Sequence, residues 1–128
     1  MAVYSYDYDF TYAPSAPVVE IIVTSDLSAT ALTLVALLDS GADATMLPFA
    51  VLEQVQAEIL ETRYLCTVTG KRTIVDIYRV AIQVGPYHFR AVRAIATDSP
   101  AEIILGRDVL NQLIVTLNGL AAVTEISQ

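Results

Sequence analysis

The sequence is poor in the residues from which many functional sites are built. It has no tryptophan, one cysteine and one histidine, and its seven lysines and arginines stand against fourteen acidic residues. A single cysteine excludes an intrachain disulfide, and a single histidine excludes a zinc site built on several histidines of one chain. The formal net charge of −7 disfavours nucleic acid as a partner, because an acidic surface repels phosphates.

Long hydrophobic runs are also missing, although apolar residues make up 55% of the chain. The longest apolar stretch, Ala31–Leu38, ends at Asp39 and is far too short to cross a bilayer. The apolar excess of this small chain therefore predicts a subunit interface rather than a membrane segment. No basic segment precedes an apolar one near the N-terminus, and together with the single cysteine this favours a cytoplasmic location.

The length fits one domain preceded by an unusual N-terminal segment. We divide the chain into an aromatic and acidic arm, 1–17, and a domain, 18–128. Alternation with a period of two predicts a strand in the arm. Such a strand must bury its apolar face, and it could do so at the edge of its own sheet, on a partner subunit or in a substrate groove. The alternating aromatic residues are Tyr4, Tyr6, Tyr8, Phe10 and Tyr12.

The domain is predicted to consist mostly of β-strands, with one or two short helices. Because Ala31–Leu38 is almost wholly apolar, we expect this strand to be buried on both faces. Helices are predicted over 48–60 and 107–113, and Asn118-Gly119 predicts a tight hairpin. Alternation in the hairpin strand 73–84 predicts a buried face formed by Val80, Ile82 and Val84. The other predicted strands are 18–24, 63–69, 87–96, 103–105, 114–117 and 120–126.

The motif Leu37-Leu38-Asp39-Ser40-Gly41-Ala42-Asp43-Ala44-Thr45 places a carboxylate at the end of an apolar strand. Burying a lone carboxylate is costly, whereas two carboxylates at ~3 Å can share one proton. Such a pair can deprotonate a water with one member and protonate a peptide carbonyl with the other. By itself, however, Asp-Ser-Gly also fits a plain turn, because all three residues favour turns.

A second motif, Ile103-Ile104-Leu105-Gly106-Arg107-Asp108-Val109-Leu110, follows some sixty residues later. Together the two motifs resemble the retropepsins, the retroviral-type aspartic proteases and their cellular and bacterial relatives, from about Val18 to the C-terminus. The resemblance implies a closed β-barrel and an aspartic endopeptidase that acts on peptides or proteins without a cofactor. Since the chain has one Asp-Ser-Gly, a two-fold axis must supply the second carboxylate, which predicts a homodimer.

The resemblance also implies roles for the residues of the first motif. Asp39 would be the catalytic carboxylate, and Ser40 and Gly41 would complete the catalytic motif. The Ser40 hydroxyl would bond across the dimer and lock the two loops. Gly41, Ala42 and Asp43 would bind the main chain of the substrate.

Residues outside the first motif would brace the site and close it. Arg107, next to Gly106, would pair with Asp43 of either subunit, as suits its bidentate guanidinium; plain helix-start chemistry is the alternative reading of this segment. The hairpin 63–78 would be a flap whose tip, Val68-Thr69-Gly70, contacts the substrate. Retroviral flap tips are rich in glycine, whereas this tip has only one glycine. The shape of the binding site therefore does not follow from the resemblance.

Two questions stay open from the sequence alone. A retropepsin-like fold could instead serve as a non-enzymatic dimerisation or peptide-binding module, although the intact Asp39-Ser40-Gly41 favours an enzyme. Cys66 lies on the predicted flap, where it could be sensitive to oxidation or act simply as a small apolar residue.

Overall fold

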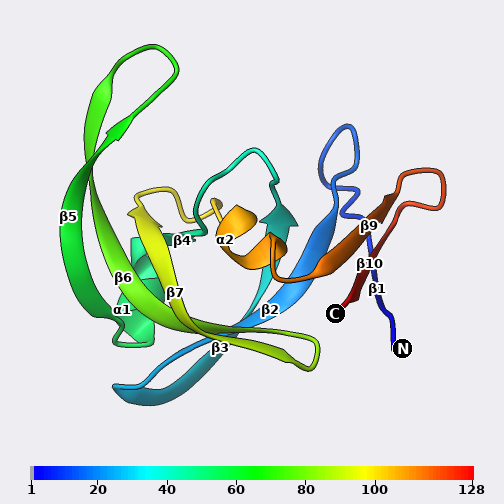
Figure 1. The fold of residues 1–128 in the computed structure, drawn as a ribbon, viewed down its shortest axis with the longest axis horizontal. Helices are drawn as coiled ribbons and strands as arrows, with labels where there is room; N and C mark the ends of the chain where they lie inside the picture. The colour runs from blue at the N-terminus through cyan, green and yellow to red at the C-terminus, as the bar shows by residue number, and fades with distance from the viewer. Residues whose placement is uncertain (1) are drawn as a thin grey trace.

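The computed structural model describes residues 2–128, which form ten strands and two short helices (Figure 1). The helices are α1 (Phe49–Gln54) and α2 (Arg107–Leu110), and neither is long enough to span a bilayer. The strands are β1 (Tyr4–Asp7), β2 (Val18–Ser25), β3 (Ser28–Leu38), β4 (Met46–Pro48), β5 (Glu58–Cys66), β6 (Arg72–Val84), β7 (Tyr87–Thr97), β8 (Ile104–Leu105), β9 (Ile114–Asn118) and β10 (Val123–Ser127).

Seven of these strands form one sheet that closes on itself. Their order is β2-β3-β8-β4-β7-β6-β5, and β2 also pairs with β6, so that six strands complete a ring and β5 extends from it. The pairs β3–β8 and β4–β7 are parallel, and the other neighbours are antiparallel. The closed, mostly β architecture predicted from the sequence is therefore confirmed.

The barrel interior is built from the alternating apolar residues of its strands. Val80, Ile82 and Val84 are at most 1% exposed, which confirms the predicted buried face of β6. The prediction for β3 is wrong: only Ala36 is buried there, and Val35 is 53% exposed. One face of β3 packs on the core and the other faces outward, so that an apolar composition alone did not reveal how many faces were covered.

Both predicted helices are shorter in the structure than in the sequence analysis. The predicted helix over 48–60 is wrong beyond Gln54, because Gln56 takes a left-handed backbone conformation (φ 53°) that ends the helix. The chain then enters β5 at Glu58, where pairing with β6 replaces helical hydrogen bonds. Similarly, α2 ends at Leu110 instead of residue 113.

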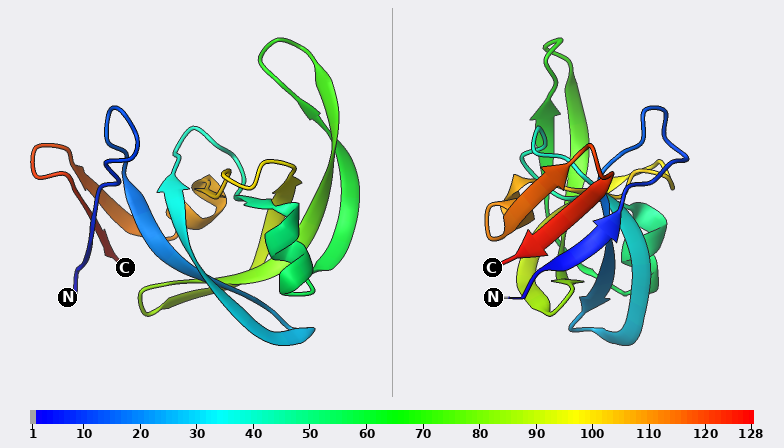
Figure 2. Two further views of the ribbon diagram at one scale, coloured as in Figure 1. Left: turned by 180° about the vertical axis from the view of Figure 1, so that it is seen from behind. Right: turned by 90° about the vertical axis from the view of Figure 1, so that its right-hand side faces the viewer.

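The N-terminal arm and the C-terminal hairpin form a separate three-stranded sheet in the order β1-β10-β9 (Figure 2). The arm thus adds to the edge of its own chain's sheet, the first of the three places considered. Burial raises the pKa of Tyr6 above its ordinary value, and the nearby Glu20 carboxylate adds to this. The strand ends at Asp7, and Phe10 lies beyond it and is 73% exposed.

The connection between β9 and β10 is longer than the predicted tight turn. Four residues, 119–122, separate the strands, and Ala122 rather than Gly119 takes a left-handed conformation (φ 54°). The Asn118 side chain accepts a hydrogen bond from the Ala121 N–H (3.0 Å), which stabilises this wider loop. The two-residue turn predicted from Asn118-Gly119 is therefore wrong, although the hairpin itself exists.

Candidate active site

Asp39 stands at the end of β3, where the barrel brings two distant segments together. Leu38 pairs with Leu105 of β8, and the Asp39 N–H donates to the Leu105 carbonyl oxygen (3.0 Å). The side chain is half-buried, and its Oδ1 accepts a hydrogen bond from the Gly41 N–H (2.9 Å). The Ala42 N–H in turn donates to the Asp39 carbonyl oxygen (3.1 Å). These bonds fix both the backbone and the carboxylate of Asp39 in a tight loop.

Gly41 and Ser40 contribute to this loop in different ways. A Cβ added at Gly41 would lie 3.1 Å from Asp39 Oδ1, so glycine leaves room beside the carboxylate. Its backbone is not left-handed, and space rather than conformational freedom is what it provides. Ser40 is exposed, and within residues 2–128 its hydroxyl makes no hydrogen bond.

Arg107 braces the loop from the start of α2. Its Nη1 donates to the Ser40 carbonyl oxygen (2.6 Å), its Nη2 forms an ion pair with Asp43, and its backbone N–H donates to the Ala42 carbonyl oxygen (2.9 Å). The pair implied by the family resemblance thus forms within one subunit. Gly106 is needed for this approach, because a Cβ there would lie 2.6 Å from the Ala44 backbone.

The sequence analysis missed a second brace, between Thr45 and Asp108. The Asp108 carboxylate accepts hydrogen bonds from the Thr45 N–H (3.1 Å) and the Thr45 hydroxyl (2.9 Å). Thr45 is fully buried, and its hydroxyl oxygen accepts the Gly106 N–H (3.3 Å). Both residues lie in the two motifs, but the 63 positions between them hid their contact.

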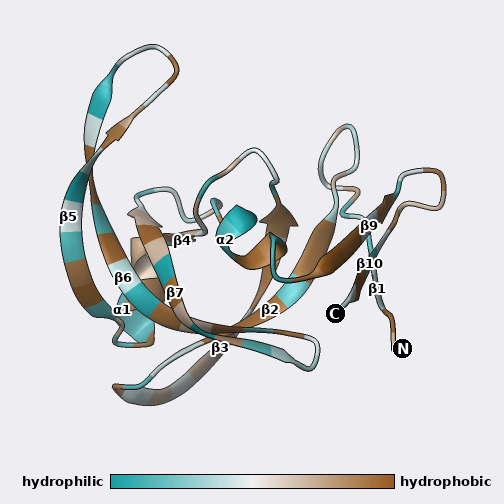
Figure 3. Cartoon of the chain, in the orientation of Figure 1, coloured by the Kyte–Doolittle hydropathy of each residue, from teal (hydrophilic) through white to brown (hydrophobic). Residues whose placement is uncertain are grey.

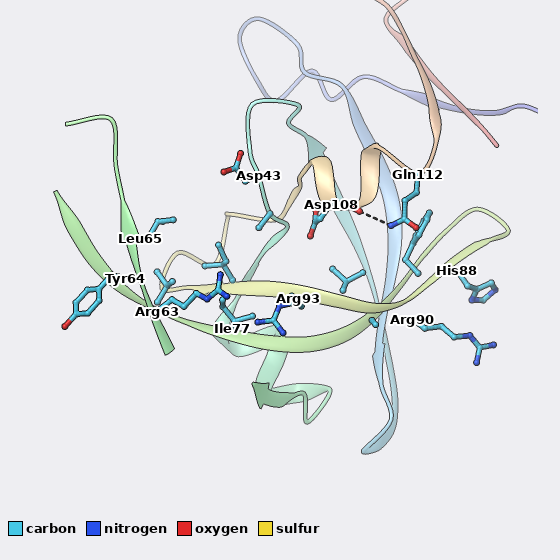
Figure 4. A pocket seen from close by; sticks show the side chains of 16 residues that line it. Asp43, Arg63, Tyr64, Leu65, Ile77, His88, Arg90, Arg93, Asp108 and Gln112 are labelled. Atoms are coloured by element: carbon cyan, nitrogen blue, oxygen red, sulfur yellow. Dashed lines mark hydrogen bonds between the residues drawn. The ribbon is translucent and has the colours of Figure 1, made fainter. Parts of the chain in front are cut away.

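A hollow of about 610 Å³ opens next to this loop (Figure 4). Asp43 and Ala44 line it on one side, and the base of the β5–β6 hairpin, the strand β7 and the helix α2 complete it. The residues Val68, Thr69 and Gly70, predicted to contact substrate, are not among those that line it. Alternation along β5 and β7 could have indicated the lining residues Arg63, Leu65, Arg93 and Ile95 instead.

In the part of the chain that the structure describes, the tip of the β5–β6 hairpin is held only by hydrogen bonds among its own residues. The Thr67 N–H donates to the Lys71 carbonyl oxygen (3.0 Å), and the Gly70 N–H donates to the Thr67 carbonyl oxygen (2.9 Å). Gly70 has φ +80°, which favours glycine at this turn. Val68 is fully exposed, and Cys66, at the end of β5, is exposed as well.

The side chains of this region do not suggest a metal centre. Among residues 2–128, histidine, cysteine, aspartate and glutamate form no group of three or more that could hold a metal ion. The ionisable residues of the loop 39–45, together with Arg107, instead contact one another or backbone groups.

Solved structures share this fold. The protease of EIAV in complex with the inhibitor HBY-793 is 24% identical, with a TM-score of 0.56, and the match covers 76% of this chain and 86% of that one. A retropepsin-like aspartic protease from Rickettsia conorii is 10% identical, with a TM-score of 0.62 over 98% of this chain and 91% of that one. Among curated proteins, none matches this chain.

The fold and the braced Asp-Ser-Gly loop define the class of protein as retropepsin-like. Residues 28–112 match the family described as "gag-polyprotein putative aspartyl protease". This match spans both motifs and most of the barrel, and the chain belongs to this retropepsin-like aspartic protease family.

Proposed function

We propose that the protein is an aspartic endopeptidase that hydrolyses peptide bonds as a homodimer, with Asp39 of each subunit forming the catalytic pair. One carboxylate, ionised, takes a proton from a bound water, whose oxygen attacks the peptide carbonyl carbon. The other, protonated, gives its proton to the carbonyl oxygen. The resulting gem-diol collapses and the C–N bond breaks: the carboxyl that took the proton of the water gives it to the leaving nitrogen, and a hydroxyl of the gem-diol returns a proton to the other carboxylate.

The observation that carries this proposal is the geometry around Asp39. Its carboxylate accepts a hydrogen bond from the Gly41 N–H (2.9 Å) and is half-buried. Arg107 and Asp108 form hydrogen bonds with the surrounding loop and keep it in place. A group that exchanges protons during catalysis must be held in place and yet reach its substrate, and this loop meets both conditions. The adjacent hollow provides space for a peptide.

The dimer follows from the same chemistry, because one chain offers one such carboxylate. The terminal sheet supports it: β9 is an edge strand with pairing on one side within residues 2–128, and its Ile114 and Leu117 are 53% and 56% exposed. Figure 3 shows the apolar character of this strand. The free hydroxyl of Ser40 is available to bond to the partner's loop.

The proposal is tested by the substitution Asp39→Asn. We expect the dimer to remain folded, by circular dichroism and sedimentation, while hydrolysis of a peptide library falls at least ~10⁴-fold, the scale for removing one member of an acid–base unit. Activity of the unmodified protein should be inhibited by pepstatin. Residual activity of Asp39→Asn within tenfold of the unmodified protein would overturn the assignment of Asp39.

The pH dependence of hydrolysis gives an independent test. Because one carboxyl must be protonated and the other ionised, the rate should be bell-shaped, with an acidic to mildly acidic optimum. A rate that rises steadily above neutrality would contradict the carboxylate pair. If the folded dimer bound peptides but cleaved none at any pH, the protein would be a peptide-binding module instead.

A further inference from the structure

Two arginines stand side by side in the hollow next to the catalytic loop. Arg63 of β5 and Arg93 of β7 both form an ion pair with one oxygen, Oε1, of Glu61. Both side chains remain more than half exposed, and Figure 4 shows them beneath Asp43. Two positive charges therefore share a single carboxylate at a place open to a ligand.

The carboxylates that line the hollow, Asp43 and Asp108, are already engaged. Asp43 forms an ion pair with Arg107. Asp108 accepts two hydrogen bonds from Thr45 and one from the Val109 N–H. The arginine pair thus keeps one positive charge that no residue of the hollow balances.

This excess charge is unusual in a chain with a net charge of −7. The first 62 residues contain no lysine or arginine, and Arg63 is the first cation of the sequence. At the other end of β7, His88 and Arg90 also line the hollow, but Figure 4 shows them apart from the pair Arg63 and Arg93.

We propose that Arg63 and Arg93 form a subsite that selects an acidic side chain, aspartate or glutamate, of the bound peptide. The inference rests on the proposed function, because it assumes that the peptide lies along the hollow beyond Asp43. A carboxylate placed between the two guanidinium groups would complete two ion pairs with charge-assisted hydrogen bonds. Apolar neighbours, Leu65 and Ile95, would pack against the methylene groups of that side chain.

The proposed dimer makes this inference more specific. A two-fold axis through the catalytic pair repeats the arginine subsite at both ends of the groove. The preference for an acidic residue should therefore appear at one position on each side of the scissile bond.

The same β5–β6 hairpin carries a matched control on its opposite face. Arg63 and Tyr64 are consecutive in β5, so their side chains point to opposite faces of the sheet. The guanidinium carbon of Arg72 lies 4.4 Å from the centre of the Tyr64 ring, and Arg72 is not among the residues that line the hollow. The change Arg72→Glu thus alters charge on this hairpin outside the subsite.

The experiment uses decapeptide libraries in which one position is fixed as Glu, Gln or Lys and the other positions are degenerate. Retention by immobilised Asp39→Asn protein measures binding without hydrolysis, and the unmodified protein measures cleavage of the same libraries. We expect Glu to exceed Lys by about three- to tenfold at one position on each side of the scissile bond, as suits half-exposed ion pairs. Gln should lie between them.

The variants Arg63→Glu and Arg93→Glu should reverse this order, whereas Arg72→Glu should leave it unchanged. Arg63→Gln and Arg93→Gln, which only remove charge, should abolish the preference and serve if the reversed charges impair folding. The inference is overturned if no position prefers Glu, or if Arg72→Glu changes the preference as much as Arg63→Glu does.

The two assays separate this inference from the proposed function. Selective retention of Glu libraries without any cleavage by the unmodified protein would support the acidic subsite and overturn the peptidase. Cleavage that is indifferent to Glu, Gln and Lys at every position would support the peptidase and overturn the subsite.

Discussion

The catalytic loop, 39–45, and the tip of the β5–β6 hairpin, 67–71, both connect strands, yet they are held in opposite ways. The catalytic loop donates hydrogen bonds to Leu105 and Asp108 and accepts them from Arg107, residues more than sixty positions away. Within residues 2–128 the hairpin tip forms hydrogen bonds only among its own residues, and it is exposed throughout. One turn is thus held by distant parts of the fold, while the other has only the local stability of a hairpin, so we expect it to open more readily.

The largest effect on stability is expected where the catalytic loop meets α2. Gly106→Ala would place a Cβ 2.6 Å from the Ala44 backbone. Because Gly106 is buried and the clash is with backbone atoms, the backbone must shift, at a cost of about 3 kcal/mol. Chemical denaturation measures this loss. The control is Gly119→Ala, where nothing lies within 4 Å, and a change there of less than about 0.5 kcal/mol is expected.

A second pair of variants removes the same group, a threonine hydroxyl, once from the loop 39–45 and once from strand β5 of the hairpin. Thr45→Val removes a buried hydroxyl that bonds to Asp108 and accepts the Gly106 N–H, and we expect a loss of about 2 kcal/mol in unfolding free energy. Thr62→Val removes an exposed hydroxyl that bonds to Asp76 (2.8 Å) at the base of the hairpin, with an expected loss below about 0.5 kcal/mol. Equal losses in denaturation would mean that the loop 39–45 and the β5–β6 hairpin are not held differently.

The third prediction concerns the contact between subunits. Ser40→Ala should weaken the proposed dimer by about 0.5–2 kcal/mol, since a hydrogen bond across the two loops is lost while its partner stays buried. Sedimentation at several concentrations measures the shift in dimer dissociation. Because the Ser40 hydroxyl makes no bond within residues 2–128, unfolding of the isolated subunit should change little; a fully active monomer would contradict the role of the dimer.

The smallest effect is expected at the hairpin tip. Gly70→Ala places a side chain at φ +80° with nothing within 4 Å, so that the cost is conformational, about 1 kcal/mol. The tip should open more often, and hydrogen exchange of the amides of Thr67 and Gly70 should speed up. Exchange in the catalytic loop should stay the same, and a parallel change there would show that the two turns are coupled.

Local patterns in the sequence predicted the features that depend on neighbouring residues. Alternation identified the buried face of β6, and the apolar run before Asp39 identified the strand that carries the carboxylate. The glycine at position 70 located the turn of the hairpin. The same kind of reasoning extended the helix after Pro48 too far, because the left-handed Gln56 and the pairing of β5 with β6 have no local signal in the sequence.

The sequence by itself located most of the strands, though not β4, and placed Asp39 at the end of one of them, since these features follow from residue types and their spacing. Only the tertiary structure decided that β2 pairs with β6 to close the barrel, that Thr45 bonds to Asp108, and that Arg63 and Arg93 share Glu61. The physical reason is distance along the chain. Contacts between residues tens of positions apart depend on how every intervening strand pairs, and periodicity within one segment carries no information about its partner.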